Sequence, residues 1–323
     1  MTSESAANME SMGQFLELNT GDRMPVLGLG TAVWNQYEEI KSAVTVALQV
    51  GYRHFDTASF YGSEGAVGAA LMEAFQSGFV KREQVFVTTK LWGDEHDDPL
   101  AAISRSLKNL QLEYVDLYLV HWPLRLKKGC SNPPKEEDFL PLTMKSTWQG
   151  METCFEMGLT KAIGVSNFSC KKMEDLLSHA KILPAVNQVE MHPMWQQKKL
   201  RDYCSKMKIQ ICAYSPLGGR NTRWGSSMLM DNPIIHEIAQ KHGKTISQVL
   251  LRWGVEQGVC VLPKSFNKGR ITENFQVLDW CLTAEDRENI NKIEQWKIVR
   301  AEIHVNSTTG PYRTLEELWD GEI

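Results

Sequence analysis

Short apolar runs alternate with longer stretches in which apolar residues recur at helical spacing, and this pattern repeats eight times along the chain. Such alternation is typical of parallel strands joined by crossover helices. The short runs are apolar almost throughout, as expected for strands that are buried on both faces. The predicted strands span residues 26–32, 54–58, 85–91, 115–122, 161–167, 185–190, 210–216 and 259–265.

Capping residues mark the borders of the predicted helices. The helix after the first strand ends at Gly51, and the helix after the third strand begins with Asp98 as its cap and Pro99 as its first residue. The first helix has an apolar face, which predicts that it packs against a sheet. This face consists of Ile40, Ala43, Val44, Ala47 and Leu48.

Eight strand–helix units that follow one another without a linker predict a single (β/α)8 barrel of the TIM type over residues 14–323, in the α/β class. Residues 14–25 are predicted to form a small hairpin ahead of the barrel, and residues 1–13 a flexible tail. In such barrels the chemistry lies at the carboxyl ends of the strands, so long segments at that end are candidate substrate walls. These are the connections 123–142 after the fourth strand and 217–232 after the seventh, and the irregular segment 296–323.

Composition excludes several classes of protein. The chain has 35 basic and 39 acidic side chains and no basic stripe, so we expect no nucleic-acid partner. An odd number of cysteines, seven, without a C-x-x-C pair predicts neither a disulfide framework nor a zinc site. No apolar run reaches 18 residues, and the N-terminus lacks the features of a signal peptide. We therefore expect a cytoplasmic protein without membrane contact, and a monomer because no heptad pattern or large apolar face is present.

Polar residues stand near the end of nearly every predicted strand, after an otherwise apolar run. The carboxyl ends of parallel barrel strands meet at one mouth, so these side chains are expected to lie near one another. The set comprises Asp56, Lys90, His121, Asn167, Gln188, Glu190, Tyr214 and Lys264.

Four residues at this mouth could protonate a carbonyl. Buried Asp56 and Lys90 on adjacent strands should pair, because an unpaired buried charge is costly. Tyr61 follows in the next loop, and a nearby ammonium should lower the pKa of its phenol from about 10 and make it a usable proton donor. His121 could hydrogen-bond the same carbonyl oxygen. An Asp–Lys pair or a histidine alone is more often structural, but the four together favour catalysis.

Three stretches of the chain resemble the aldo-keto reductase family: GYRHFDTASFYGSEGAVG, MGLTKAIGVSNF and LPKSFNKGRITEN. The resemblance covers residues 14–323. Within the family the chain is similar to plant reductases of specialised metabolism, a group that includes deoxymugineic acid synthase, codeinone reductase, methylecgonone reductase and chalcone reductase. AVNQVEMHPMWQQKKLRDYC and GPYRTLEELWDGEI carry that likeness.

The resemblance implies a catalytic tetrad of Asp56, Tyr61, Lys90 and His121, with NADPH as the cofactor. At the nicotinamide end it implies Gly30, Thr31, Asp56, Ser166, Asn167, Gln188 and Tyr214. Along the pyrophosphate it implies Ser215, Leu217 and Gly219, and around the 2′-phosphate and adenine Lys264, Ser265, Phe266, Asn267, Arg270, Glu273 and Asn274.

The charges in the stretch LPKSFNKGRITEN agree with a phosphate site. Lys264 and Arg270 flank the start of the last barrel helix, where free backbone N–H groups and the helix dipole favour an anion. Each cation could add a charge-assisted contact to a phosphate that NADH lacks. A solvated basic turn would be the simpler interpretation of these residues if they did not follow the eighth strand.

Competing motifs are incomplete. Gly28 and Gly30 lack the third glycine of a Rossmann fingerprint. Tyr37 and Lys41 have the Y-x-x-x-K spacing of short-chain dehydrogenases, but no glycine-rich cofactor loop accompanies them. The spacing of six between His236 and His242 does not suit a metal site on one helical face, so we expect no bound metal.

Tryptophans at the barrel mouth predict an aromatic substrate pocket. Trp34, Trp92 and Trp122 follow strands, and Trp224 lies in the loop after the seventh strand. With Tyr61 and His121 they form the expected substrate site. The leading hypothesis is NADPH-dependent reduction of a ketone or aldehyde on a plant specialised metabolite, with the proton from Tyr61. The alternatives are a broad-specificity reductase that detoxifies aldehydes and a binding module that senses NADPH without turnover.

Overall fold

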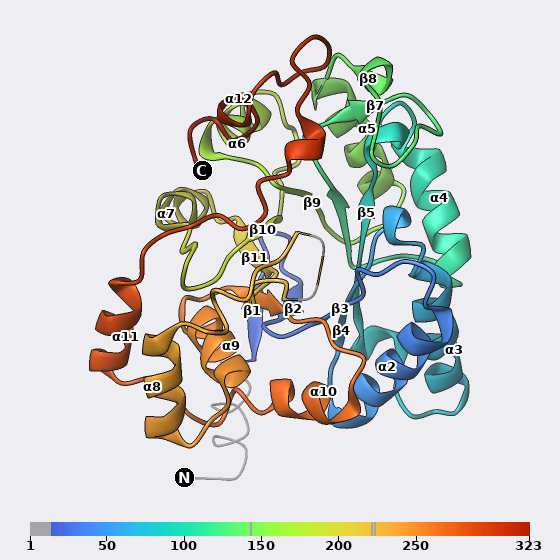
Figure 1. Cartoon of the computed structure of the whole chain (residues 1–323). Coiled ribbons are helices and arrows are strands. Elements are labelled where there is room, and N and C mark those ends of the chain that lie inside the picture. Colours follow the sequence, from blue (N-terminus) through green and yellow to red (C-terminus); the bar gives the residue numbers. More distant parts are fainter. Residues whose placement is uncertain (1–13, 143, 221, 223) are drawn as a thin grey trace.

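The computed structural model describes residues 14–142, 144–220, 222 and 224–323. The predicted flexible tail, residues 1–13, lies outside the described residues. Eight parallel strands form one sheet, and helices surround it (Figure 1). Its strands are β3 (Leu29–Gly30), β4 (His54–Asp56), β5 (Phe86–Leu91), β6 (Leu117–Val120), β9 (Ile163–Ser166), β10 (Val186–Glu190), β11 (Gln210–Tyr214) and β12 (Cys260–Leu262).

Backbone hydrogen bonds close this sheet into a barrel. The amide of Val261 in β12 donates to the carbonyl of Val26 at 2.8 Å, and the amide of Gly28 donates to the carbonyl of Val261 at 3.0 Å. Gly30 in β3 donates to Pro263 at 3.0 Å. The first and last strands are thus joined, and the predicted (β/α)8 barrel is confirmed.

Eight helices follow the barrel strands and bury their apolar faces on the sheet. The predicted face of the first helix, its end at Gly51 and the Asp98–Pro99 start of the third are all confirmed. The eight helices are α2 (Tyr37–Val50), α3 (Glu64–Gln76), α4 (Pro99–Leu110), α5 (Met144–Glu156), α6 (Cys170–Leu177), α7 (Lys198–Lys206), α9 (Ile246–Glu256) and α10 (Lys268–Phe275).

Among the described residues, three further helices lie outside the eight strand–helix units. Helix α8 (Pro233–His242) precedes α9, while α11 (Ala284–Asn291) and α12 (Leu315–Trp319) follow α10. The pattern of apolar residues did not separate α8 from α9. Gly243, with φ of 59°, ends α8, and the Thr245 side chain caps α9. A left-handed glycine followed by a capping residue is a strong signal for a break between two helices.

The predicted hairpin is present and closes the amino-terminal end of the barrel. Strands β1 (Phe15–Glu17) and β2 (Arg23–Pro25) pair antiparallel. Leu18 and Met24 are buried among residues that begin the barrel strands, such as Phe86 and Leu117. The chemistry must therefore take place at the opposite end.

Two of the three segments predicted as substrate walls are described throughout, while residues 221 and 223 of the third lie outside the described residues. The connection after β6 contains a small ribbon of β7 (Arg125–Leu126) and β8 (Phe139–Leu140). The segment after α11 crosses over the strands and ends at α12 beside α6 (Figure 1). Among the described residues, no helix is both long and apolar enough to cross a bilayer.

Candidate active site

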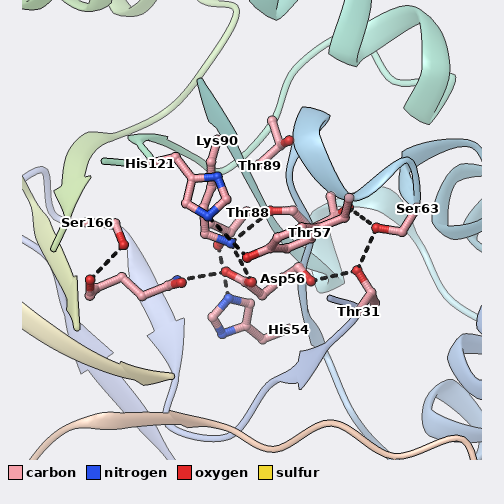
Figure 2. A network of polar contacts seen from close by, with 12 residues as sticks. Thr31, His54, Asp56, Thr57, Ser63, Thr88, Thr89, Lys90, His121 and Ser166 are labelled. Carbon is pink, nitrogen blue, oxygen red and sulfur yellow. Dashed lines mark hydrogen bonds and ion pairs between the residues drawn. The ribbon is translucent and has the colours of Figure 1, made fainter. Parts of the chain in front are cut away.

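A buried ion pair lies at the carboxyl ends of two neighbouring strands. Asp56 ends β4 and Lys90 stands in β5, and Lys90 Nζ lies 2.6 Å from Asp56 Oδ1. The same ammonium donates to the carbonyl of Thr57 at 2.9 Å (Figure 2). Both side chains are almost fully buried. The expected pairing of Asp56 with Lys90 is confirmed.

The structure brings Tyr61 and His121 to the same place. Tyr61 ends the short 3₁₀ helix η1 (Ser59–Tyr61) that follows β4, and His121 follows β6. The Tyr61 hydroxyl lies 3.2 Å from His121 Nε2, and Lys90 Nζ lies 5.1 Å from the centre of the tyrosine ring. All four residues of the expected tetrad thus meet at one mouth of the barrel.

The pKa of Tyr61 is shifted in the direction opposite to the expected one. Burial raises this pKa above the ordinary value, Lys90 lowers it, and Asp56 raises it again. The prediction of a lowered pKa is therefore wrong in sign, because desolvation of the phenolate outweighs the attraction of the ammonium. Tyr61 consequently keeps its proton at neutral pH, as a proton donor must.

His121 is neutral at neutral pH. Burial lowers its pKa well below the ordinary value, and the charge of Lys90 acts in the same direction. Its Nδ1 has no hydrogen-bond partner among the described residues. A neutral imidazole can carry its proton on Nε2 and donate it to an oxygen that lies beside Tyr61.

A network of hydroxyl groups fixes the loops around the ion pair. Thr31 Oγ1 donates to the carbonyl of Asp56 at 2.9 Å and lies 3.0 Å from Ser63 Oγ. Ser63 Oγ lies 2.7 Å from Thr57 Oγ1 (Figure 2). These contacts join the ends of β3 and β4 to the start of α3, on either side of Tyr61. Thr57 and Ser63 were not among the predicted site residues, although both lie in the first of the family-like stretches.

The residues expected at the nicotinamide form one hydrogen-bonded set. Gln188 Nε2 donates to Asp56 Oδ2 at 2.7 Å, and Ser166 Oγ donates to the carbonyl of Gln188 at 2.7 Å. Asn167 Nδ2 donates to the carbonyl of His121 at 3.0 Å, while the Tyr214 hydroxyl donates to Asn167 Oδ1 at 2.8 Å. The four expected residues therefore lie next to the tetrad.

Two residues at this mouth have strained backbone conformations. Asn167 has φ of 66° and Ser215 has φ of 48°. Positive φ is costly for residues other than glycine and is concentrated at functional sites. Gly218 and Gly219 follow Ser215 with φ of 74° and 64°, which bends the expected pyrophosphate loop. In this loop Trp224 packs against Trp34 of the loop after β3, with 5.8 Å between ring centres.

The start of α10 carries positive charge without a matching carboxylate. Lys264 and Arg270 make no ion pair with any other described residue. Partial burial and the charge of Arg270 lower the pKa of Lys264. The Asn267 side chain caps the helix by accepting from the amide of Arg270 at 3.0 Å. Two cations at a helix N-terminus suit a phosphate group.

Other residues of this stretch also fit a nucleotide. The buried Asn274 Oδ1 has no hydrogen-bond partner among the described residues, so it can accept from a base. Phe266 lies below Lys264, whose Nζ is 5.2 Å from the ring centre, and Ser265 is buried. The Glu273 carboxylate is engaged, because it accepts from the Thr245 hydroxyl at 2.8 Å.

Aromatic rings border the tetrad on the substrate side. Phe60 stacks on Trp92 with 3.7 Å between ring centres, and Trp34 meets Phe60 edge-on at 5.9 Å. The Trp92 ring also contacts His121 at 5.1 Å. A cleft of about 450 Å³ runs past Trp34, Phe60 and Tyr61. The described residues that line this cleft come from the segments after β3 and β4, so of the four predicted pocket tryptophans only Trp34 lines it directly.

His304 packs against two of these tryptophans and was not predicted from the sequence. It ends the short 3₁₀ helix η5 (Glu302–His304) in the segment after α11. Its buried ring lies 4.5 Å from Trp122 and 6.0 Å from Trp92, measured between ring centres. Burial lowers the pKa of His304 to about 4, so the ring is neutral. The only signal in the sequence was the irregular segment that contains it.

Comparison with known proteins agrees with this arrangement. Residues 26–295 match the model of the Aldo/keto reductase family. Deoxymugineic acid synthase 1 of Zea mays is 53% identical over 305 residues, which cover 93% of this chain and 97% of that protein. The 7-acetyl-epi-neemfruitin B aldo-keto reductase of Melia azedarach is 48% identical over 308 residues, 94% of this chain and 96% of that protein.

A solved structure from another organism has the same fold. The aldose reductase of Schistosoma japonicum superposes with a TM-score of 0.82 at 38% sequence identity, over 90% of this chain and 95% of that one. The resemblance inferred from the three sequence stretches, including that to plant enzymes, is confirmed. The chain therefore belongs to the aldo/keto reductase family and is an oxidoreductase that reduces carbonyl groups.

Proposed function

We propose that the chain reduces a ketone or aldehyde on a plant specialised metabolite, with NADPH as the cofactor and Tyr61 as the proton donor. The observation that carries this proposal is the 3.2 Å distance between the Tyr61 hydroxyl and His121 Nε2. An oxygen that accepts from both groups would lie close to the buried Lys90 ammonium. This is the geometry that a carbonyl oxygen needs when negative charge develops on it.

The roles of the four residues follow from their charges. NADPH, when bound, supplies the hydride to the carbonyl carbon. His121, which is neutral, donates a hydrogen bond to the carbonyl oxygen and orients it. Tyr61 gives its proton to that oxygen, and Lys90 stabilises the phenolate that remains. Asp56 keeps Lys90 charged, because its carboxylate raises the pKa of the buried ammonium.

The preference for NADPH over NADH rests on Lys264 and Arg270. Both cations lack a carboxylate partner among the described residues. A 2′-phosphate would supply the missing negative charge at a helix N-terminus. NADH has no such group, so the positive charge would add little to its binding.

The substrate class is proposed from the walls of the pocket and from the relatives. Trp34 and Phe60 present ring surfaces rather than charges to the cleft, and Trp92 stacks on Phe60. Relatives are named for reductions of neemfruitin and luvungin derivatives and for the synthesis of deoxymugineic acid. We propose a ring-containing ketone as the substrate.

The test is the substitution Tyr61→Phe, with Tyr37→Phe as the matched control. Both tyrosines line the same cleft, but the Tyr37 hydroxyl faces the carbonyl of Gly65 at 3.5 Å. Loss of a general acid should lower kcat by about 10²–10⁴-fold. The dissociation constant of NADPH should stay unchanged, and Tyr37→Phe should keep full activity. Turnover by Tyr61→Phe at the wild-type rate would refute the role of Tyr61.

Substrate screening separates the competing functions. Faster turnover of bulky cyclic ketones than of small aldehydes supports metabolite reduction, and the reverse supports detoxification of aldehydes. Binding of NADPH without turnover of any carbonyl would indicate a sensor. We further propose that the protein acts as a cytoplasmic monomer, which fits its seven unpaired cysteines and can be tested by sedimentation.

A further inference from the structure

A buried carboxylate holds the segment after α11 on the mouth of the barrel. Glu190 ends β10, and its side chain accepts hydrogen bonds from the backbone amides of Ile298 and Val299 at 2.9 and 3.0 Å. His192 Nε2 lies 2.9 Å from the same carboxylate. Both Glu190 and His192 are only 1% exposed. The start of the segment is therefore tied to the strand that also carries Gln188.

The adjacent Lys297 is buried between two indole rings. Its side chain is only 5% exposed, and Nζ lies 3.6 Å from the ring centre of Trp319 and 5.0 Å from that of Trp195. This ammonium makes no hydrogen bond or ion pair with the other described residues. It is stabilised instead by the faces of the two indoles and by the charges of Glu190 and Glu322.

A continuous series of ring contacts leads from Lys297 to the catalytic histidine. Trp319 donates its indole N–H to the carbonyl of Arg300 at 2.9 Å, and its ring lies 5.8 Å from that of Trp122. Trp122 packs on His304 at 4.5 Å, and His304 lies 6.0 Å from Trp92. Trp92 packs on His121 at 5.1 Å. The segment is thus linked through packed rings to Trp92, which contacts both His121 and Phe60 of the cleft.

We propose that Glu190 and Lys297 are positioning residues that hold the segment 297–304 against Trp92 and Trp122 and so set the pocket for bulky carbonyl substrates. The proposal rests on the proposed carbonyl reduction. Neither residue touches the tetrad, so both act through His304 and the rings. Buried charges can often be replaced by apolar side chains of similar volume without loss of stability. The two buried charges at this junction therefore fit a role in fixing the position of the segment rather than in stabilising the fold.

The charge of Lys297 should be lost at mildly alkaline pH. Burial lowers its pKa to about 8, although Glu190 and Glu322 act in the opposite direction. Above that pH the neutral amine no longer attracts either the indoles or Glu190, while Glu190 keeps its contacts with His192 and the two amides. The wall should then loosen, which matters for a substrate that fills the pocket and not for one that leaves most of it empty.

The experiment compares a bulky cyclic ketone with a small aldehyde between pH 7 and 9. In the wild type we expect KM for the ketone to rise several-fold around pH 8, while KM for the aldehyde stays constant. Lys297→Met keeps the length of the side chain and removes its charge. It should raise KM for the ketone at least tenfold at pH 7, abolish the rise with pH and leave kcat for the aldehyde and NADPH binding unchanged.

Lys297→Arg keeps the positive charge between the indoles and should restore the low KM for the ketone at pH 7. Because a guanidinium stays charged up to pH 9, the rise of KM with pH should be absent in this variant. Equal changes for ketone and aldehyde, or no change for either, would overturn the proposal. The wild-type pH series requires no variant, so it decides the question even if Lys297→Met does not fold. If the wild type turns over neither carbonyl at any pH, the proposed reaction itself is refuted, and the inference with it.

Discussion

Asp56 uses each of its carboxylate oxygens for a different part of the site. Oδ1 pairs with Lys90 at 2.6 Å, and Oδ2 accepts from Gln188 at 2.7 Å. Gln188 belongs to the set expected at the nicotinamide, so this single side chain joins the proposed proton-transfer groups to the proposed cofactor site. Its charge also affects Tyr61, because the carboxylate raises the pKa of the phenol.

Asp56→Asn should therefore change the pH dependence of the reaction. Asp56 raises the pKa of the buried Lys90 ammonium, so without this carboxylate Lys90 should lose its charge at a lower pH. Reduction requires that charge to stabilise the phenolate, and the charge is present below the pKa of Lys90 and lost above it. The alkaline decline of kcat/KM should consequently begin at a lower pH than in the wild type. A pH profile of the reduction measures this shift, and a shift to higher pH would contradict it.

Asp97→Asn is the control for this prediction, because Asp97 is an exposed carboxylate that pairs with Arg125. It should leave the profile unchanged. Asp56→Asn also leaves Lys90 buried without an anionic partner. The free energy of unfolding should fall by about 3–5 kcal/mol, as is typical when one member of a buried pair is removed. Urea denaturation below the alkaline limit measures this loss.

The meeting of the four expected tetrad residues could be predicted at the residue scale, but not their electrostatics. Asp56 and Lys90 were found because each interrupts an apolar strand near its carboxyl end. The raised pKa of Tyr61 depends on how much solvent surrounding chains remove from its hydroxyl. The contribution of His304 depends on the path of an irregular segment. Both are tertiary properties, which spacing along the sequence does not encode.

At the scale of an element, the start of helix α10 should decide the preference for NADPH over NADH. Arg270 stands in the first turn of this helix, and the Asn267 side chain caps its start. Arg270→Ala removes a positive charge that no described carboxylate balances. A lost charge-assisted contact costs about 1.5–3 kcal/mol, so the dissociation constant of NADPH should rise by about 10–150-fold. Binding of NADH should change less than twofold.

Fluorescence titration with both cofactors measures these constants. Arg287→Ala is a suitable control, because Arg287 is a partly exposed arginine on α11 that already pairs with Glu256. Its removal should leave both constants unchanged. Equal weakening of NADPH and NADH by Arg270→Ala would contradict the assignment of this helix start to the 2′-phosphate.

The elements themselves were predicted better than their borders. All eight barrel strands occur where the apolar runs indicated, yet β3 is limited to Leu29–Gly30 within the run 26–32. An apolar run marks burial, whereas a strand requires ladder hydrogen bonds as well. Before β3 the ladder is irregular, because Leu27 forms only an isolated bridge with Val261 and Gly28 separates it from Leu29.

At the scale of the molecule, side chains that stabilise the fold fill one end of the barrel, and the proposed catalytic residues lie at the other. Leu18 and Met24 fill the amino-terminal end together with residues such as Phe86 and Leu117. The tetrad lies at the carboxyl ends of the same strands. The strands between them are buried on both faces and tightly packed, so a local change at one end need not disturb the geometry at the other.

Met24→Ala tests this separation. Met24 is 0% exposed in the closing hairpin, so the substitution leaves a cavity and should lower the free energy of unfolding by about 2–5 kcal/mol. Because the tetrad is at the opposite end of the barrel, kcat/KM of the folded protein should remain within about twofold of the wild type. Met157→Ala, at a methionine that is 58% exposed, should change neither quantity. Urea denaturation and steady-state kinetics at one temperature supply both values. A tenfold loss of kcat/KM in Met24→Ala without loss of stability would show that the amino-terminal end of the barrel contributes to the reaction.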